Sequence, residues 1–183
     1  MSAIPITRDD VLARLAETKV ELATTFDALS DAQWGWTPDD VVWSAANLAE
    51  HIGAVEYSMA RLFRERFDTL DAADFTPEQH AKRDALIRRA VPDRSAKIEA
   101  PAGVRPKHRF ATRAECMAAL MAARDAMVDV VRTRGETLRT RSAPHPAFGN
   151  LDGLQWGLLC AEHGVRHLAQ LAELRTRPGY PSA

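Results

Sequence analysis

The chain has 183 residues, of which 46% are hydrophobic, so it is long enough and apolar enough to form one domain with a packed core. Its formal net charge of −1 indicates neither a nucleic-acid partner nor an acidic membrane surface. No apolar run approaches the roughly 20 residues of a membrane span, the first residues lack the features of a signal peptide, and the two cysteines lie far apart, so we expect a cytoplasmic protein without disulfides.

Helical periodicity dominates the chain, and we find no convincing strand-like alternation. The first predicted helix covers residues 6–29, with Thr7 as its N-cap and Asp10 three residues later. The second helix begins after Ser44. Its apolar residues form a one-sided stripe that consists of Leu48, Ile52, Val55, Met59, Leu62 and Phe63.

Capping boxes mark the start of two further helices. Residues 76–79, TPEQ, open a short helix that runs to about residue 91. Residues 112–115, TRAE, open a long helix that ends near Gly135, a residue typical of helix C-termini. The last predicted helix covers approximately residues 151–174.

Four long helices and one short helix indicate an all-α protein, an antiparallel four-helix bundle formed by a single domain over residues 1–183. The connections 30–43, 92–111 and 135–150 are longer than bundle loops usually are, and such loops often build or cover a site. The last helix is apolar on two sides, which is typical of a central helix or of a helix that packs on a second subunit. A homodimer contact and burial beneath a long loop both explain this pattern.

Two histidines lie four residues apart in the last helix. His163 and His167 therefore project from one face, where two imidazoles could chelate a metal ion. His51, in the second helix, also faces the bundle interior, where an imidazole must be hydrogen-bonded or bound to something. Three inward histidines favour a metal site, whereas the pair alone fits ordinary polar residues equally well. Structural roles are expected for the remaining histidines, which are His80, His108 and His145.

Other metal schemes fit the last helix less well. The zincin motif HExxH fails because Gly164 follows His163, and the Glu-x-x-His pairs of di-iron bundles are missing. Cys160 is the candidate for a fourth protein ligand, but three successive ligands from one helix would strain a tetrahedral site. The remaining scheme is a three-histidine site with open positions, as in catalytic centres.

Three stretches carry a resemblance to a known family. Trp43-Ser44 followed by Leu48 and His51 is similar to a W-[ST]…L-x-x-H motif. Residues 144–156, PHPAFGNLDGLQW, are similar to an HP-x-FG-x-L…W motif, and residues 163–171, HGVRHLAQL, match H-x-x-x-H-x-x-Q-[LI]. With these motifs in this order, the sequence resembles the DinB-like superfamily, which includes YfiT-like metal-dependent hydrolases and thiol-dependent S-transferases.

The resemblance implies a four-helix bundle in up-down-down-up order that is commonly dimeric. It also implies a divalent metal ion, usually zinc or nickel, bound by His51, His163 and His167. The substrate would be a small molecule, in some members together with a low-molecular-weight thiol, and the family name does not imply DNA binding. The alternative is a non-catalytic bundle that binds a metal or small molecule in a structural, stress-response or sensing role.

The expected chemistry follows from three neutral imidazoles, which leave the full charge of a cation on the site. A metal-bound water or thiolate would be the reactive group, which gives hydrolysis or S-transfer. Gln170, Trp156 and Cys160 share the histidine face and are candidate neighbours of the site. A polar rim position explains Gln170 at least as well, and core packing is the favoured explanation for Trp156. Cys160 is explained either by the immediate surroundings of the site or by the core. The basic stretch 104–110, VRPKHRF, is predicted to be a solvated loop or to attract an anionic substrate.

Overall fold

The computed structural model describes residues 4–96 and 98–182. Within this part of the chain the α-helices are α1 (Arg8–Asp27), α2 (Asp31–Gly35), α3 (Ala45–Glu65), α4 (Pro77–Ala90), α5 (Arg113–Arg134) and α6 (Gly153–Arg175). Short 3-10 helices lie in the connections: η1 (Phe67–Thr69), η2 (Ala102–Val104) and η3 (Gly135–Thr140). The predominantly helical architecture confirms the predicted fold class. No helix among the described residues is long and apolar enough to cross a membrane.

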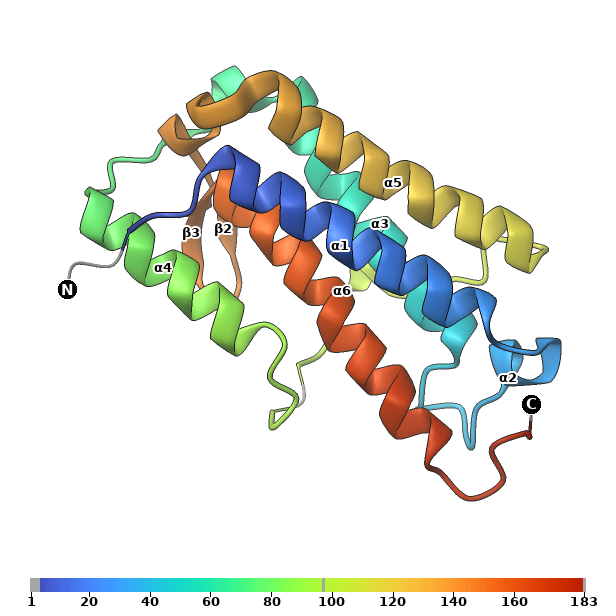
Figure 1. Cartoon of the computed structure of the whole chain (residues 1–183). Helices are drawn as coiled ribbons and strands as arrows, with labels where there is room; N and C mark the ends of the chain where they lie inside the picture. Colours follow the sequence, from blue (N-terminus) through green and yellow to red (C-terminus); the bar gives the residue numbers. More distant parts are fainter. Residues whose placement is uncertain (1–3, 97, 183) are drawn as a thin grey trace.

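The four long helices α1, α3, α5 and α6 form a bundle (Figure 1). Helices α1 and α6 pack together and run in one direction, whereas α3 and α5 pack together and run in the opposite direction. This is the up-down-down-up order that the resemblance implied. Two neighbouring parallel helices cannot be joined by a short turn, so a long crossover separates α3 from α5 and includes α4.

Local sequence sets where the helices begin. Asp152 caps α6, which starts at Gly153, two residues later than expected. Ser30 caps the short helix α2, which lies in a segment that was expected to be a loop. Each predicted N-cap side chain accepts a hydrogen bond from the backbone N–H three residues later, and its own backbone N–H donates to the side chain of that residue. These reciprocal bonds complete a capping box and confirm the N-caps Thr7, Ser44, Thr76 and Thr112.

The expectation that the chain lacks strands is wrong for residues 141–152. Strands β2 (Arg141–His145) and β3 (Gly149–Asp152) form an antiparallel hairpin, and β1 (Asp71–Ala72) pairs with the other edge of β2. These strands are too short and too polar to produce a detectable alternation. Gly149, with a φ of +67°, closes the hairpin turn. The sheet adjoins the start of α6, about 15 Å along that helix from His163.

Helix α6 is the central element of the fold. It packs against α1, α3, α4 and α5, and most of its side chains are buried. In Figure 1 it lies between α4 and α1, so the short helix covers one apolar side and the bundle covers the other. Helix α4 adds a layer outside the four long helices, and this layer makes α6 a central helix. Both apolar sides of α6 are thus buried within one chain, so they do not require a second subunit. The homodimer stays a prediction from the resemblance.

A buried ion pair lies beneath α6. The guanidinium of Arg124 in α5 donates from Nε and Nη2 to the two carboxylate oxygens of Glu56 in α3, over 2.7 and 2.6 Å, and both side chains are completely buried. Arg124 Nη1 donates to the Leu15 carbonyl and the Thr18 hydroxyl of α1. A Cβ at Gly164 would lie 3.3 Å from Arg124 Nη2, so glycine at this position lets α6 lie close to the guanidinium. The pair therefore links α1, α3 and α5 below the helix that carries His163.

Candidate metal centre

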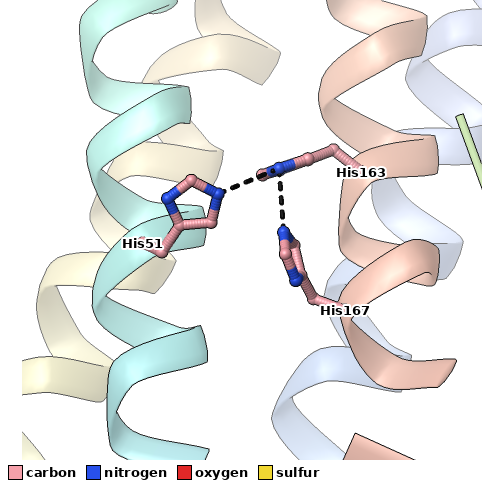
Figure 2. A group of neighbouring side chains, drawn as sticks. All are labelled: His51, His163 and His167. Carbon is pink, nitrogen blue, oxygen red and sulfur yellow. Dashed lines mark hydrogen bonds between the residues drawn. The ribbon is translucent and has the colours of Figure 1, made fainter. Parts of the chain in front are cut away.

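Three imidazole rings meet between α3 and α6 (Figure 2). His51 comes from α3, whereas His163 and His167 come from α6. The Nε2 atom of His163 lies 3.2 Å from His51 Nε2 and 2.9 Å from His167 Nε2. Donor atoms of all three rings lie within 4.8 Å of one another, and no cysteine or carboxylate among the described residues joins the group. The structure thus brings together the three predicted histidines and leaves Cys160 outside.

Oxygen atoms hold the outer nitrogens of two of the rings. The carbonyl oxygen of Val104 lies 2.7 Å from His51 Nδ1, and Gln170 Oε1 lies 2.9 Å from His167 Nδ1. Such an oxygen only accepts hydrogen bonds, so Nδ1 carries the proton in both rings. Nε2 then presents a lone pair to the centre, which is the tautomer that a metal ligand needs.

His163 occupies the middle of the group. An imidazole nitrogen offers one in-plane position, for a proton or a lone pair, so Nε2 of His163 cannot hydrogen-bond well to both neighbours. Its Nδ1 is buried without a hydrogen-bond partner in the described part of the chain, so, unlike in the other two rings, no outer contact holds a proton on Nδ1. A cation would satisfy all three nitrogens at once, and ligands in a tetrahedral zinc site lie about 3.3 Å apart. The residues present therefore fit a divalent ion.

Burial keeps the three imidazoles neutral. Burial, followed by repulsion from the other two rings, holds the pKa of His163 well below its usual value. Burial also lowers the pKa of His167 to about 3 and lowers the pKa of His51. Protons therefore do not compete with a cation for these nitrogens at pH 7.

The metal-free protein should lose stability as the pH falls from 7 to 5. The folded state keeps His167 neutral, whereas the unfolded chain protonates it near pH 6.5. The free energy of unfolding should therefore fall below pH 6.5, by up to about 1.4 kcal/mol per pH unit for each such histidine. Urea unfolding at several pH values measures this loss, and the slope should be smaller in His167→Gln. An equal slope in that variant would contradict the low pKa.

Trp43 is a site residue that the sequence reasoning used only as part of a motif. Its ring centroid lies 4.9 Å from that of His51 and 6.3 Å from that of His167, and it is inclined by 29° to the latter ring. Trp43 immediately precedes the N-cap of α3, so the helix start fixes its position. The indole covers two imidazoles with an apolar surface, which shields that part of the site from water.

Among the three predicted neighbours of the site, the described residues show only Gln170 hydrogen-bonded to a site histidine. Cys160 is buried in the core, and burial, then the charge of Glu56, raise the pKa of its thiol far above the usual value. Trp156 packs in the same core and donates from Nε1 to the Ala143 carbonyl over 3.1 Å. Both side chains take the core role that was their alternative explanation.

The remaining histidines have structural surroundings. His80 Nδ1 lies 2.8 Å from a carboxylate oxygen of Asp152, the N-cap of α6. His145 Nδ1 accepts a hydrogen bond from the backbone N–H of Ala147 over 3.1 Å, which stabilises the hairpin turn. His108 is exposed. These positions agree with the expectation that none of the three belongs to the metal site.

Nearby carboxylates neutralise part of the basic stretch 104–110. Arg109 pairs with the buried carboxylate of Glu50 over 3.0 Å, and Arg105 pairs with Glu99 over 3.3 Å. The connection between α4 and α5 nevertheless reaches the site, because Val104 supplies the carbonyl that accepts from His51. This connection therefore contributes to the site through one backbone oxygen, in line with the expectation that a connection of this length builds or covers a site.

Known proteins that are similar to this chain agree with its fold. The uncharacterized protein YuaE of Bacillus subtilis (strain 168) is 25% identical over 161 residues, which cover 88% of this chain and 94% of YuaE. The crystal structure of TT2238, described as a four-helix bundle protein, is 22% identical, has a TM-score of 0.58, and is aligned over 93% of this chain and 100% of that chain. YfiT from Bacillus subtilis, described as a probable metal-dependent hydrolase with an unusual four-helix bundle topology, is 16% identical, has a TM-score of 0.58, and is aligned over 95% of this chain and 89% of that chain.

At these identities the two solved structures support the fold alone. The sequence profile of the DinB superfamily, in contrast, matches residues 8–171. This match extends over most of the chain and includes all three site histidines. The chain therefore belongs to the DinB superfamily.

Proposed function

We propose that this protein is a metal-dependent enzyme that hydrolyses a small molecule, with one divalent cation bound by His51, His163 and His167. The observation that carries the proposal is the convergence of three neutral imidazoles, with Nε2 atoms 2.9 and 3.2 Å apart. The description of YfiT as a probable metal-dependent hydrolase, together with the shared fold, supports hydrolysis as the reaction.

When bound, a divalent cation with three imidazole ligands would lower the pKa of a water molecule or thiol at an open position toward neutrality. The chain's own residues hold the rings for this task. Val104 and Gln170 accept from the outer nitrogens, and Trp43 covers two of the rings. Imidazole ligands suit zinc, nickel, cobalt and iron, of which zinc or nickel are expected from the resemblance.

Metal-depleted protein should gain hydrolytic activity toward a panel of small esters and amides when zinc or nickel is added. The gain should disappear in His167→Ala, because two imidazoles do not hold the cation, and should persist in His108→Asn, which changes an exposed histidine. The measurement is the initial rate at increasing metal concentration. Equal rates for chelated and metal-loaded protein would refute the proposal.

The same centre would serve S-transfer if a low-molecular-weight thiol took the open position. Cys160 does not supply that thiol, since it is a core side chain whose pKa is raised by burial. Repeating the panel with electrophiles, with and without an added thiol, separates the two reactions. Turnover that requires the thiol would identify S-transfer, and not hydrolysis, as the reaction. A rise in melting temperature with metal, without any turnover, would instead support a non-catalytic metal-binding role.

A further inference from the structure

We propose that Arg94 is a positioning residue of the metal centre, which fixes the tautomer of His167 through Gln170. The inference rests on the proposed metal site but concerns a side chain outside the histidine group. Arg94 follows α4 in the chain, and its Nη1 donates to Gln170 Oε1 over 3.2 Å. The same oxygen lies 2.9 Å from His167 Nδ1.

The tautomer of His167 depends on which end of the Gln170 amide faces the imidazole. The oxygen and the NH2 group have nearly the same shape, so packing alone does not select one of them. An NH2 group toward His167 would make Nδ1 an acceptor and would place the ring proton on Nε2. A protonated Nε2 cannot bind a cation. The site therefore requires the amide oxygen at this position.

Arg94 selects that orientation because a guanidinium has only donors. Its Nη1 can approach the oxygen of Gln170 but not the NH2 group. The amide oxygen then accepts from Arg94 and from His167 Nδ1, and the lone pair of His167 Nε2 points toward His163. A residue with no contact to the centre thus determines which nitrogen of a ligand is free.

The position of Arg94 is itself fixed by neighbouring groups. Its Nε and Nη2 donate to the two carboxylate oxygens of Glu173 over 2.6 and 2.7 Å, and the side chain is only 23% exposed. Arg166 donates to the backbone carbonyls on both sides of Arg94, including those of Val91 and Ala96. Arg94 is therefore held on two sides, unlike a free surface arginine.

His51 provides an internal control for this inference. Its Nδ1 faces the backbone carbonyl of Val104, which accepts hydrogen bonds whatever the orientation of any side chain. A change at Arg94 should therefore alter His167 and leave His51 unchanged. A general loosening of the site would alter both rings.

The first test uses the metal-free protein with 15N-labelled histidine. Long-range proton–nitrogen NMR reports which ring nitrogen carries the proton, and His167→Gln identifies the signals of that residue. We expect the wild type to hold the proton on His167 Nδ1 and Arg94→Met, which keeps an apolar stem without donors, to give a mixture of tautomers. The His51 signals should not change. A His167 tautomer that is the same in Arg94→Met as in the wild type would overturn the inference.

Rescue separates positioning from a structural role. Gln170→Glu places a carboxylate, which only accepts, opposite His167, so its orientation no longer depends on Arg94. The double variant Arg94→Met with Gln170→Glu should therefore restore the Nδ1-protonated form. Arg61→Ala, which removes an exposed ion pair with Glu65 in α3, should have no effect. Failure of the rescue would assign Arg94 a structural role instead.

The second test measures cobalt binding by visible absorption. Arg94→Met should bind cobalt about 10- to 100-fold more weakly, as loss of an outer partner usually does, and the Gln170→Glu double variant should recover most of the affinity. Equal affinities of wild type and Arg94→Met would count against the inference. A wild type that binds no cobalt, zinc or nickel would refute the proposed function, whereas the NMR result on metal-free protein would still decide the role of Arg94.

Discussion

Replacing His163 by alanine should abolish metal binding, and it is the most damaging single change expected at this centre. His163 Nε2 is the atom that lies closest to both other ligands, so its loss leaves two rings on opposite helices without a link. Affinity should fall by more than the 10- to 100-fold typical of an outer-partner change. Metal analysis of protein purified without a nickel column should find about one ion per chain in the wild type and almost none in the variant.

Thermal unfolding provides a second readout of the same change. A ligand present at 1,000 times its dissociation constant stabilises the folded state by about 4 kcal/mol. Added zinc should therefore raise the melting temperature of the wild type and of His108→Asn, but not that of His163→Ala. A zinc-induced rise of the same size in His163→Ala would show that the three histidines are not the binding site.

Replacing Glu56 by alanine should destabilise the fold by about 3–5 kcal/mol. Glu56 and Arg124 are both completely buried, so removal of the carboxylate leaves a guanidinium charge in the core without its counter-ion. Urea unfolding should show this loss. The exposed pair of Arg61 and Glu65 on the same helix offers a matched control, and Glu65→Ala should cost less than about 1 kcal/mol.

A double replacement distinguishes the cost of an unpaired charge from the loss of packing. Glu56→Leu combined with Arg124→Met removes both charges and keeps most of the volume, so it should recover much of the stability lost in Glu56→Ala. The hydrogen bonds from Arg124 to Leu15 and Thr18 would still be lost, so the recovery should be incomplete. A double variant as unstable as Glu56→Ala would show that the unpaired charge is not the main cause of the lost stability, and that these hydrogen bonds matter more.

The parts of the fold that could be predicted from sequence depend on local interactions. Capping boxes use residues three apart, so the starts of α1, α3, α4 and α5 are legible in the chain. The inward direction of His51 follows from the apolar stripe of its helix, and the common face of His163 and His167 follows from their spacing. These local rules were sufficient to identify the candidate ligands.

The parts that could not be predicted depend on contacts between distant segments. Val104 lies 53 residues from His51, and Arg94 lies 76 residues from Gln170, so no periodicity connects them. The packing of α4 on α6 is likewise a tertiary contact, and without it the apolar second side of α6 suggested another subunit. The strands of residues 141–152 are held by their pairing rather than by an intrinsic sequence preference.

The separation of 112 residues between His51 and His163 has a consequence for biosynthesis. At a translation rate of about 5–20 residues per second, the ribosome needs about 6 to 22 seconds to pass from the first ligand codon to the second. A nascent chain therefore holds His51 long before the other two imidazoles are synthesised, because both belong to α6, which follows α3, α4 and α5 in the chain. The three-histidine site can therefore form only after α6 has been synthesised, and a translation product that stops before α6 lacks two of the three imidazoles.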